Sequence, residues 1–367
     1  MADRNGRRNP RERAGWRWLG VFWLTVLSLM AAGGGVLEWL GPPGAVVAKP
    51  QASARGGVTQ TPATQDARTV VVVARAVLVP RVVSGRDTPG PVADPDPALL
   101  EPVSGGATGQ LPRIASDGRT AMQVYAAGFD YSSRRPRVGL LLAGIGMNEA
   151  ESHAAIRALP GGISLAVSPY AANVSRLLAT ARASGHEYLI ALPLEPAGFP
   201  LNDPGPATLL TSASLAVNAQ NLHWALSRIQ GYAGAAGVIG TMRGERFAAM
   251  SDQMDAVLSE LAGRGLIYVD PREEWGPVAK TWGRHAELVI DDPASREAID
   301  AKLAELEQLA KDHGSALGLV MRPTPVAVAR IAAWTNGLAD RGLALAPVSA
   351  LAVAPAGPPV KLSERDK

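Results

Sequence analysis

The feature that most constrains the fold is an alternation of short apolar runs with helical segments, which begins at Arg137. Each run is almost continuously apolar, as are strands of a parallel sheet that is buried on both faces. This pattern favours an α/β fold, a β/α barrel of about seven to eight strands, with a flat doubly wound sheet as the alternative. The predicted strands are Arg137–Ala143, Ile163–Ser168, Glu187–Leu192, Ala236–Gly240, Leu266–Asp270, Ala286–Ile290, Ser315–Met321 and Leu343–Val348.

Two of the intervening helices have recognisable ends. One is predicted to start at a Ser251 cap and to end near Gly263, with an apolar stripe between them. The other is predicted to use Asp292 as its cap and Pro293 as its first helical residue, and to end before Gly314.

The N-terminal residues predict a membrane segment. Residues 1–17 hold six arginines against two acids, and residues 18–37 form a run of 20 residues without a charge. Such a run is just long enough to cross a bilayer, and the arginines before it predict a cytoplasmic N-terminus. We therefore expect a basic tail (1–17) and a single-pass signal anchor (18–40) in an inner membrane, with the rest of the chain in the periplasm. A cleaved signal peptide is the alternative.

Residues 41–110 are rich in proline and glycine and predict a flexible tether. Residues 69–83 are an exception, because this run is apolar and β-prone. It is expected to dock as a strand on the folded body, and the alternative is a strand offered to a protein partner by edge addition. The folded domain is expected to span 111–355, and 356–367 to be a disordered tail.

Charge and motifs exclude several functions. The chain has a net charge of +3 and no cysteine. Because the basic tail alone carries about this charge, the body is close to neutral, and we expect no nucleic-acid partner. The absence of cysteine excludes thiol catalysis and disulfides. No glycine-rich nucleotide motif follows any predicted strand, so a nucleotide cofactor is not expected.

In a β/α barrel, catalytic groups lie on the carboxyl ends of the strands and the loops that follow. The predicted ends are rich in acids and arginines, and no histidine follows a strand there. The carboxylates could form a pair for general acid and base chemistry, or simply fix loops through hydrogen bonds. The candidates for a ligand site are Glu195, Asp203, Asp270, Asp291, Thr241 and Arg322.

The five histidines do not form a zinc-binding pattern, because none is spaced as an H-x-x-x-H or H-x-x-E-H pair. Only His186 precedes a predicted strand closely, which makes it a further site candidate. A hydrogen-bonded histidine at a helix-to-strand corner is the structural alternative. We expect no metal cofactor, with zinc or another divalent ion as the alternative.

An ordered string of motifs resembles the divergent polysaccharide deacetylase family, over about residues 111–352. The most specific are SGHEYLIALPLEP (184–196) and NDPGPATLL (202–210). The others are LPRIASDGR (111–119), Tyr125, PRVGLLLAGIG (136–146), SLAVSPYA (164–171), GYAGAAGV (231–238), RGLIYVD (264–270), LVIDD (288–292) and RGLALAPVSAL (341–351).

The resemblance implies a β/α barrel of the glycoside hydrolase and deacetylase type, and metal-dependent removal of acetyl groups from polysaccharides. In the family an Asp pair follows the first strand, and two histidines lie in later motifs. Here the Asp pair falls on Ala143 and Gly144, and the histidines fall on Thr241 and Arg322. The resemblance therefore implies a scaffold whose metal and catalytic positions are replaced.

These observations lead to one hypothesis and two alternatives. The hypothesis is a membrane-anchored, periplasmic deacetylase-like protein of envelope carbohydrate metabolism, catalytically degenerate, which binds a polysaccharide or a peptidoglycan-derived glycan. The first alternative is an active metal-dependent deacetylase whose ligands have moved to Asp270, Asp291, Glu195 and His186. The second is an envelope protein-interaction module that acts through residues 69–83.

Overall fold

The computed structural model describes Trp23, 86–103, 109–273, 278 and 280–355. The chain divides into two compact units, Met1–Ala74 and Arg75–Lys367, and every element below belongs to the second. The predicted basic tail, the anchor apart from Trp23, the run 69–83 and the tail 356–367 lie outside the described residues. Within the described part, no helix combines the length and the apolar character needed to span a bilayer.

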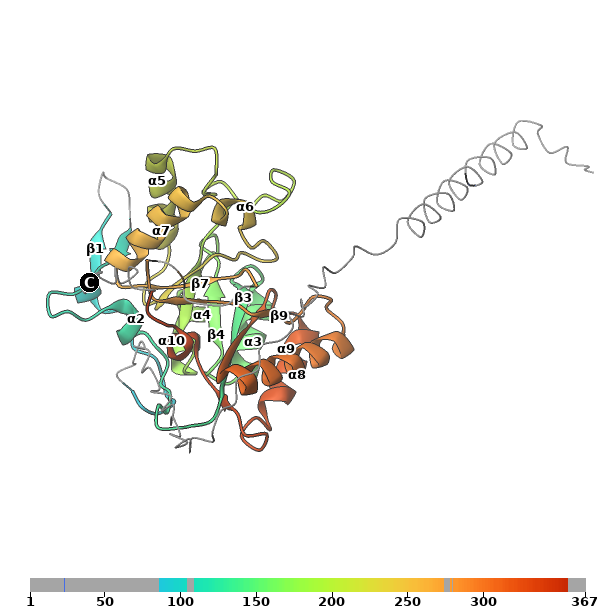
Figure 1. Ribbon diagram of the computed structural model, residues 1–367. Helices are drawn as coiled ribbons and strands as arrows, with labels where there is room; N and C mark the ends of the chain where they lie inside the picture. Colours follow the sequence, from blue (N-terminus) through green and yellow to red (C-terminus); the bar gives the residue numbers. More distant parts are fainter. Residues whose placement is uncertain (1–22, 24–85, 104–108, 274–277, 279, 356–367) are drawn as a thin grey trace, which may run out of the picture. The chain divides into compact units, whose positions relative to one another are not determined.

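One parallel sheet organises the described part of the second unit (Figure 1). Its strands, in chain order, are β3 (Arg137–Ile145), β4 (Ser164–Val167), β5 (Tyr188–Ala191), β6 (Gly234–Ala236), β7 (Ile267–Asp270), β8 (Gly283–His285), β9 (Leu288–Val289), β10 (Ser315–Val320) and β11 (Ala344–Leu345). Their order in space is β8-β7-β6-β5-β4-β3-β10-β9, and β11 pairs with the start of β3.

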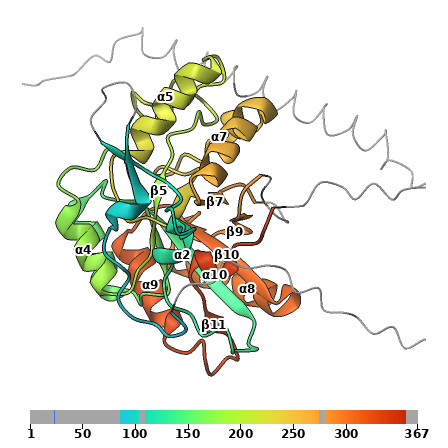
Figure 2. The same ribbon diagram turned by 90° about the vertical axis from the view of Figure 1, so that its left-hand side faces the viewer.

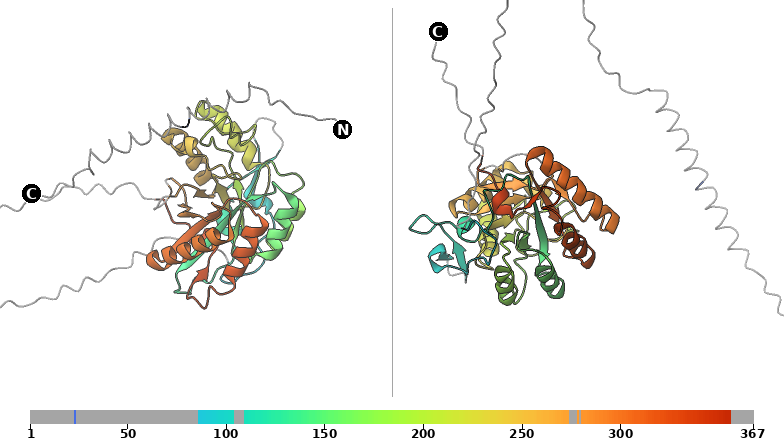
Figure 3. Two further views of the ribbon diagram at one scale, coloured as in Figure 1. Left: turned by 90° about the vertical axis from the view of Figure 1, so that its right-hand side faces the viewer. Right: turned by 90° about the horizontal axis from the view of Figure 1, so that it is seen from below.

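The sheet curls toward a β/α barrel, as the sequence predicts. The segment from Gly283 to Val289 accounts for the curling, because its first half, β8, pairs with β7 and its second half, β9, pairs with β10. The segment thus links the two ends of the sheet. Helices cover the outside of the curled sheet (Figures 1 and 3). They are α3 (Glu149–Ala158), α4 (Ser175–Ala183), α5 (Leu215–Leu226), α7 (Ser251–Gly263), α8 (Arg296–His313) and α9 (Pro325–Thr335).

Two apolar cores lie on the two faces of the sheet. The larger packs the outward side chains of the strands, such as Leu140 and Ile190, against the helices. The smaller fills the inside of the barrel with residues such as Leu141, Ala143 and Leu319. Alternation along each strand therefore assigns Ala143 to the barrel interior.

A short helix, α10 (Val348–Leu351), is packed near the amino-terminal ends of the strands. Its residues belong to the interior core, and the backbone carbonyl of Ala350 accepts a hydrogen bond from Arg137 at the start of β3 (3.2 Å). Figure 2 shows α10 near the centre, with α4, α5, α7, α8 and α9 around it. The amino-terminal end of the barrel is therefore covered by the chain itself.

The structure differs from the sequence prediction at several elements. Helix α7 begins at Ser251 itself, with Met250 at its N-cap, so the predicted Ser251 cap is wrong. The fourth strand is Gly234–Ala236, so it ends where the predicted run 236–240 begins, because small residues at 233–237 hide the strand in a count of bulky apolar residues. β8 lies in a polar stretch that gives no apolar signal. Helix α8 is capped by Ser295, whose hydroxyl accepts from the Ala298 N–H, and not by Asp292.

The predicted tether also extends too far. Residues 86–103 pack on the body, where Val92 and Leu99 are buried in the outer core. β1 (Leu100–Pro102) pairs with β2 (Gln110–Pro112) in an antiparallel ribbon. The folded domain thus begins before residue 111. Proline-rich sequence permits this because the segment docks through side chains, one short ribbon and a few backbone hydrogen bonds, such as that from the Val92 N–H to the Arg182 carbonyl oxygen.

Candidate functional site at the carboxyl ends of the strands

The loops after the parallel strands meet at one end of the barrel, which we call the mouth. Six of the predicted site residues belong to these loops or strand ends, and His186 does not. Among these six residues, the described part of the chain shows one direct hydrogen bond, from the backbone N–H of Arg322 to the carboxylate of Asp291. The six residues that share the mouth are Glu195, Asp203, Thr241, Asp270, Asp291 and Arg322.

Glu195 follows β5 and fixes two neighbouring loops. One carboxylate oxygen accepts from the Thr211 N–H and hydroxyl (2.6 and 2.7 Å), and the other pairs with Arg246 at 2.9 Å. The residue is only 3% exposed. Arg246 belongs to α6 (Glu245–Ala248), which follows β6. Glu195 therefore ties the loops after β5 and β6 together, and its oxygens are already engaged.

Asp203 lies in the exposed loop that continues from Glu195. Its Oδ1 accepts from the Gly205 N–H (2.8 Å), which closes a local turn. Gly205 lies against the ring of Tyr170: a β-carbon at Gly205 would be 2.6 Å from the ring. The Tyr170 hydroxyl accepts from the Ala207 N–H (3.1 Å). The loop is thus folded over an aromatic residue that follows β4.

Asp270 ends β7 and forms a two-pronged pair with Arg272, with contacts of 2.6 and 2.9 Å. The carboxylate is 2% exposed, and His285 Nδ1 is 3.8 Å from its Oδ2. The same end of the barrel carries Arg243 between two further acids: its contacts are 3.4 Å to Glu245 and 3.9 Å to Glu273. Most arginines at the mouth are therefore neutralised by nearby carboxylates.

Asp291 follows β9 and holds the backbone at the end of β10. Its two oxygens accept from the N–H groups of Met321 (2.8 Å) and Arg322 (3.0 Å). Burial raises the pKa of Asp291 above its ordinary value, and these two hydrogen bonds oppose the shift. The side chain of Arg322 is exposed.

Residues that follow β3 and β6 also contribute to the mouth, and the sequence analysis did not select all of them. Met147 is 57% exposed, and its methyl carbon would be 3.4 Å from a β-carbon at Gly240. Thr241 is exposed in the turn between Ile239 and Met242, which exchange two backbone hydrogen bonds. An exposed methionine directly after a buried strand is the signal that could have identified Met147.

His186 lies at the opposite end of the barrel, at the corner before β5. Its Nδ1 is 2.8 Å from the Ile163 carbonyl oxygen and its Nε2 is 3.3 Å from that of Ile156. Burial lowers the pKa of His186, so the ring is neutral and the shorter contact assigns the proton to Nδ1. The structure therefore gives His186 the structural role that was the alternative in the sequence analysis.

Comparisons with known proteins identify the family. The model of the divergent polysaccharide deacetylase family matches residues 140–352, more than half of the chain. The chain belongs to the divergent polysaccharide deacetylase family. An uncharacterised protein from Agrobacterium tumefaciens C58 has a similar structure, with a TM-score of 0.61 and 30% identity over 66% of this chain and 100% of that one.

A second solved structure is that of a "putative polysaccharide deacetylase" from Mycobacterium smegmatis. It has a TM-score of 0.36 and 12% identity, covering 62% of this chain and 92% of the other. No curated protein matches the chain.

The divergent deacetylase family implies a metal, and the residues at the expected positions do not fit one. Ala143 points into the barrel core and offers no donor atom. Gly144 has a φ of 74°, and a β-carbon there would lie 3.2 Å from both the Met321 carbonyl oxygen and Pro323 Cδ. A metal-binding aspartate at this position would therefore be both strained and crowded.

The other two positions lead to the same conclusion. Thr241 and Arg322 replace imidazoles with a hydroxyl and a cation, and a guanidinium repels a metal ion. Within the described ranges, no group of three or more histidine, aspartate or glutamate side chains is arranged to hold a metal.

Proposed function

We propose that this protein binds a glycan of the cell envelope at the barrel mouth and does not hydrolyse it by the metal mechanism. Polysaccharide is the ligand class that the family suggests. The observation that carries the proposal is Gly144, because its left-handed backbone and the close approach of Met321 and Pro323 disfavour a metal-binding side chain at this position.

The loss of the metal ligands removes the means of activating water. A metal-bound water and a positioned general base each contribute several powers of ten to hydrolysis. The carboxylates that remain are engaged by Thr211, Arg246 and Arg272 or by backbone N–H groups. They act as supports for the loops, which favours a rigid binding surface over a catalytic one.

Polar and apolar groups suited to a sugar remain exposed at the mouth. Thr241 offers a hydroxyl and Arg322 offers guanidinium N–H donors, while Met147 offers an apolar surface. Sugars present both hydroxyl groups and C–H faces, so this mixture of contacts matches their chemistry. We propose that the glycan lies across these three side chains.

We further propose that the protein is held at the inner membrane with its barrel in the periplasm. The support is the run of 20 uncharged residues at 18–37 after a cluster of arginines. This arrangement would place the barrel mouth within reach of envelope glycans.

The decisive experiment measures binding and turnover on one sample. The purified full chain is titrated calorimetrically with chitooligosaccharides and with peptidoglycan fragments, with and without EDTA, and released acetate is assayed in the same mixtures. We expect binding that EDTA does not change, and no acetate release above the blank. Acetate release that EDTA abolishes would overturn the proposal in favour of an active deacetylase.

A variant locates the glycan. Arg322→Ala is expected to weaken glycan binding by about tenfold to a hundredfold, since a charge-assisted hydrogen bond is worth about 1.5–3 kcal/mol. The matched control is Arg157→Ala, which removes an exposed arginine on α3. Equal affinities of the two variants would show that the glycan does not use the mouth.

A further inference from the structure

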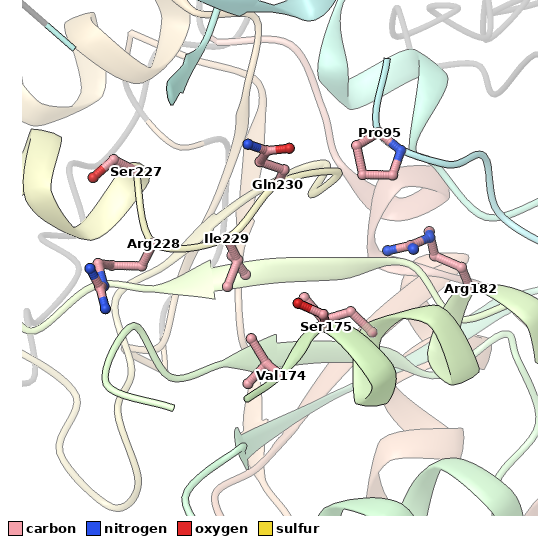
Figure 4. A pocket seen from close by; sticks show the side chains of 9 residues that line it. Pro95, Val174, Ser175, Arg182, Ser227, Arg228, Ile229 and Gln230 are labelled. Carbon is pink, nitrogen blue, oxygen red and sulfur yellow. The ribbon is translucent and has the colours of Figure 1, made fainter. Parts of the chain in front are cut away.

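A polar pocket lies outside the barrel, between α4 and the segment that leads into β6 (Figure 4). It has a volume of 330 Å³. Its walls come from α4, from Ser227–Gln230 and from Pro95, so it shares no residue with the mouth. The volume falls within the range typical of small-molecule sites.

Arg182 is the more buried of the two arginines that line this pocket. Its side chain is 12% exposed, its Nε pairs with Asp94 at 3.1 Å, and its NH1 group donates to the Tyr188 hydroxyl at 2.8 Å. Tyr188 donates in turn to the Gln230 carbonyl oxygen at 2.7 Å. Burial raises the pKa of Tyr188 to about 12, so this hydroxyl keeps its proton and the chain of hydrogen bonds persists at neutral pH.

The guanidinium of Arg182 retains donors for a ligand. It has five N–H groups, and contacts in the described residues account for those to Asp94 and Tyr188. Figure 4 shows the guanidinium directed toward Ile229 and Ser175, into the pocket. Because its partners already fix the side chain, little additional ordering would be needed on binding.

A second arginine lies at the opposite edge of the pocket. Arg228 is exposed, and its guanidinium lies over the Trp224 ring, 5.2 Å from the centroid. Among the described residues no carboxylate pairs with Arg228. The acid that pairs with Arg182, Asp94, has a side chain that is 90% exposed. Figure 4 shows the Arg228 guanidinium directed away from Ser175 and Ile229, so Arg182 is the cation that faces a ligand, and Arg228 adds positive charge at the edge of the pocket.

We propose that this pocket binds the acidic group of a sugar, a carboxylate or a phosphate carried on a single ring. A guanidinium matches the geometry of both anions. Ser175 and Gln230 supply side-chain partners for ring hydroxyls, and Leu178 and Ile229 supply apolar surface for ring C–H groups. The proposal is independent of glycan binding at the mouth.

Calorimetric titration of the full chain tests the ligand class. The probes are glucuronate, glucose 6-phosphate, glucose and inorganic phosphate. We expect one or both of the acidic sugars to bind at least about tenfold more tightly than glucose and than inorganic phosphate. Preference for glucuronate or for glucose 6-phosphate assigns the anion. Equal binding of glucose, or equal binding of inorganic phosphate, overturns the proposal.

Two variants and one control test the residues. Arg182→Lys keeps the charge but loses the fork of donors, and we expect it to weaken binding by about tenfold. Arg228→Gln is expected to weaken binding by a smaller factor, because the side chain is solvated. Arg157→Gln, with the same change of charge on α3, should bind as the unmodified chain does. Unchanged affinity in both pocket variants contradicts the proposal.

Hydrogen–deuterium exchange locates the site without any substitution. In excess of the preferred acidic sugar, we expect slower exchange in peptides that cover 174–182 and 227–230, and no change at 241–246 in the mouth. Protection at 241–246 alone would overturn the proposal that the pocket beside α4 binds the acidic sugar. It would leave the proposal of glycan binding at the mouth intact.

Discussion

Glu187 at the amino-terminal end of the barrel and the exposed side chains at the mouth show two different uses of polar groups. At the amino-terminal end, Glu187 is fully buried, and its oxygens accept from the N–H groups of Ala127 and Ser349 and from the hydroxyls of Ser164 and Ser349. At the mouth, Asp203, Thr241 and Arg322 are exposed. The comparison teaches that the buried fraction and the hydrogen-bond partners of a polar side chain separate structural residues from those that could face a ligand.

The largest expected effect belongs to Glu187. Glu187→Gln replaces one oxygen that accepts two hydrogen bonds with an amide group that cannot accept them, and leaves buried donors unpaired. We expect a loss of about 3 kcal/mol or more in the free energy of unfolding, measured by urea denaturation. Asp203→Asn at the mouth is the control, with an expected change within about 0.5 kcal/mol. Similar losses for both variants would contradict the division between the two ends.

Gly144→Ala should rank next. The added β-carbon must adopt a left-handed backbone and approach Met321 and Pro323 to 3.2 Å, so we expect a cost of about 2–3 kcal/mol. Gly314→Ala is a matched control, because Gly314 also has a positive φ of 79° and no atom near its β-carbon position. Its cost should be about 1 kcal/mol. If urea denaturation shows that the two substitutions lower the free energy of unfolding equally, crowding at Gly144 is not what disfavours a side chain there.

A pair of buried tyrosines gives a smaller effect. The Tyr232 hydroxyl donates to the Leu226 carbonyl oxygen (2.6 Å), whereas that of Tyr268 has no partner within the described part of the chain. Tyr232→Phe should lose about 1 kcal/mol, and Tyr268→Phe should be neutral or slightly stabilising. Thermal and urea unfolding of the two variants would check this. A greater loss in Tyr268→Phe would mean that its hydroxyl is satisfied in solution.

The smallest effect is a dependence of stability on pH. Burial lowers the pKa of His186 below 6.5, so the unfolded chain takes up a proton first as the pH falls. The contribution of His186 is therefore fully present above pH 6.5 and is lost as the pH falls through the folded-state pKa. The raised pKa of Asp291 acts in the opposite sense in more acidic solution. His186→Asn should weaken the dependence of the urea midpoint on pH across this range. An unchanged dependence would exclude His186 as its cause.

Sequence alone could predict the strands and the edge on which the site lies. Strands such as β3, β5 and β10 are long or strongly apolar, and Glu195 and Arg322 follow β5 and β10 at the mouth. The link formed by β8 and β9 could not be predicted, because pairing with two different strands depends on register and not on local hydrophobicity. The packing that excludes a side chain at Gly144 is likewise tertiary, since Met321 and Pro323 are far away in sequence.

His186 shows where sequence reasoning fails for a site. The spacing placed it just before a strand but did not indicate that both ring nitrogens face carbonyl groups of a neighbouring corner. Polar residues before and after a strand look alike in sequence, and they lie at opposite ends of the barrel. Burial in the folded chain separates them.

The most direct test of the central claim is the metal content of the full chain. The protein is purified without a histidine tag, loaded with zinc, desalted and measured by inductively coupled plasma mass spectrometry. Our account predicts that far less than one zinc ion per chain is retained, because Ala143, Gly144, Thr241 and Arg322 supply no ligand set. Retention of about one ion per chain would contradict it and would make a metal-dependent deacetylase the better account of the mouth.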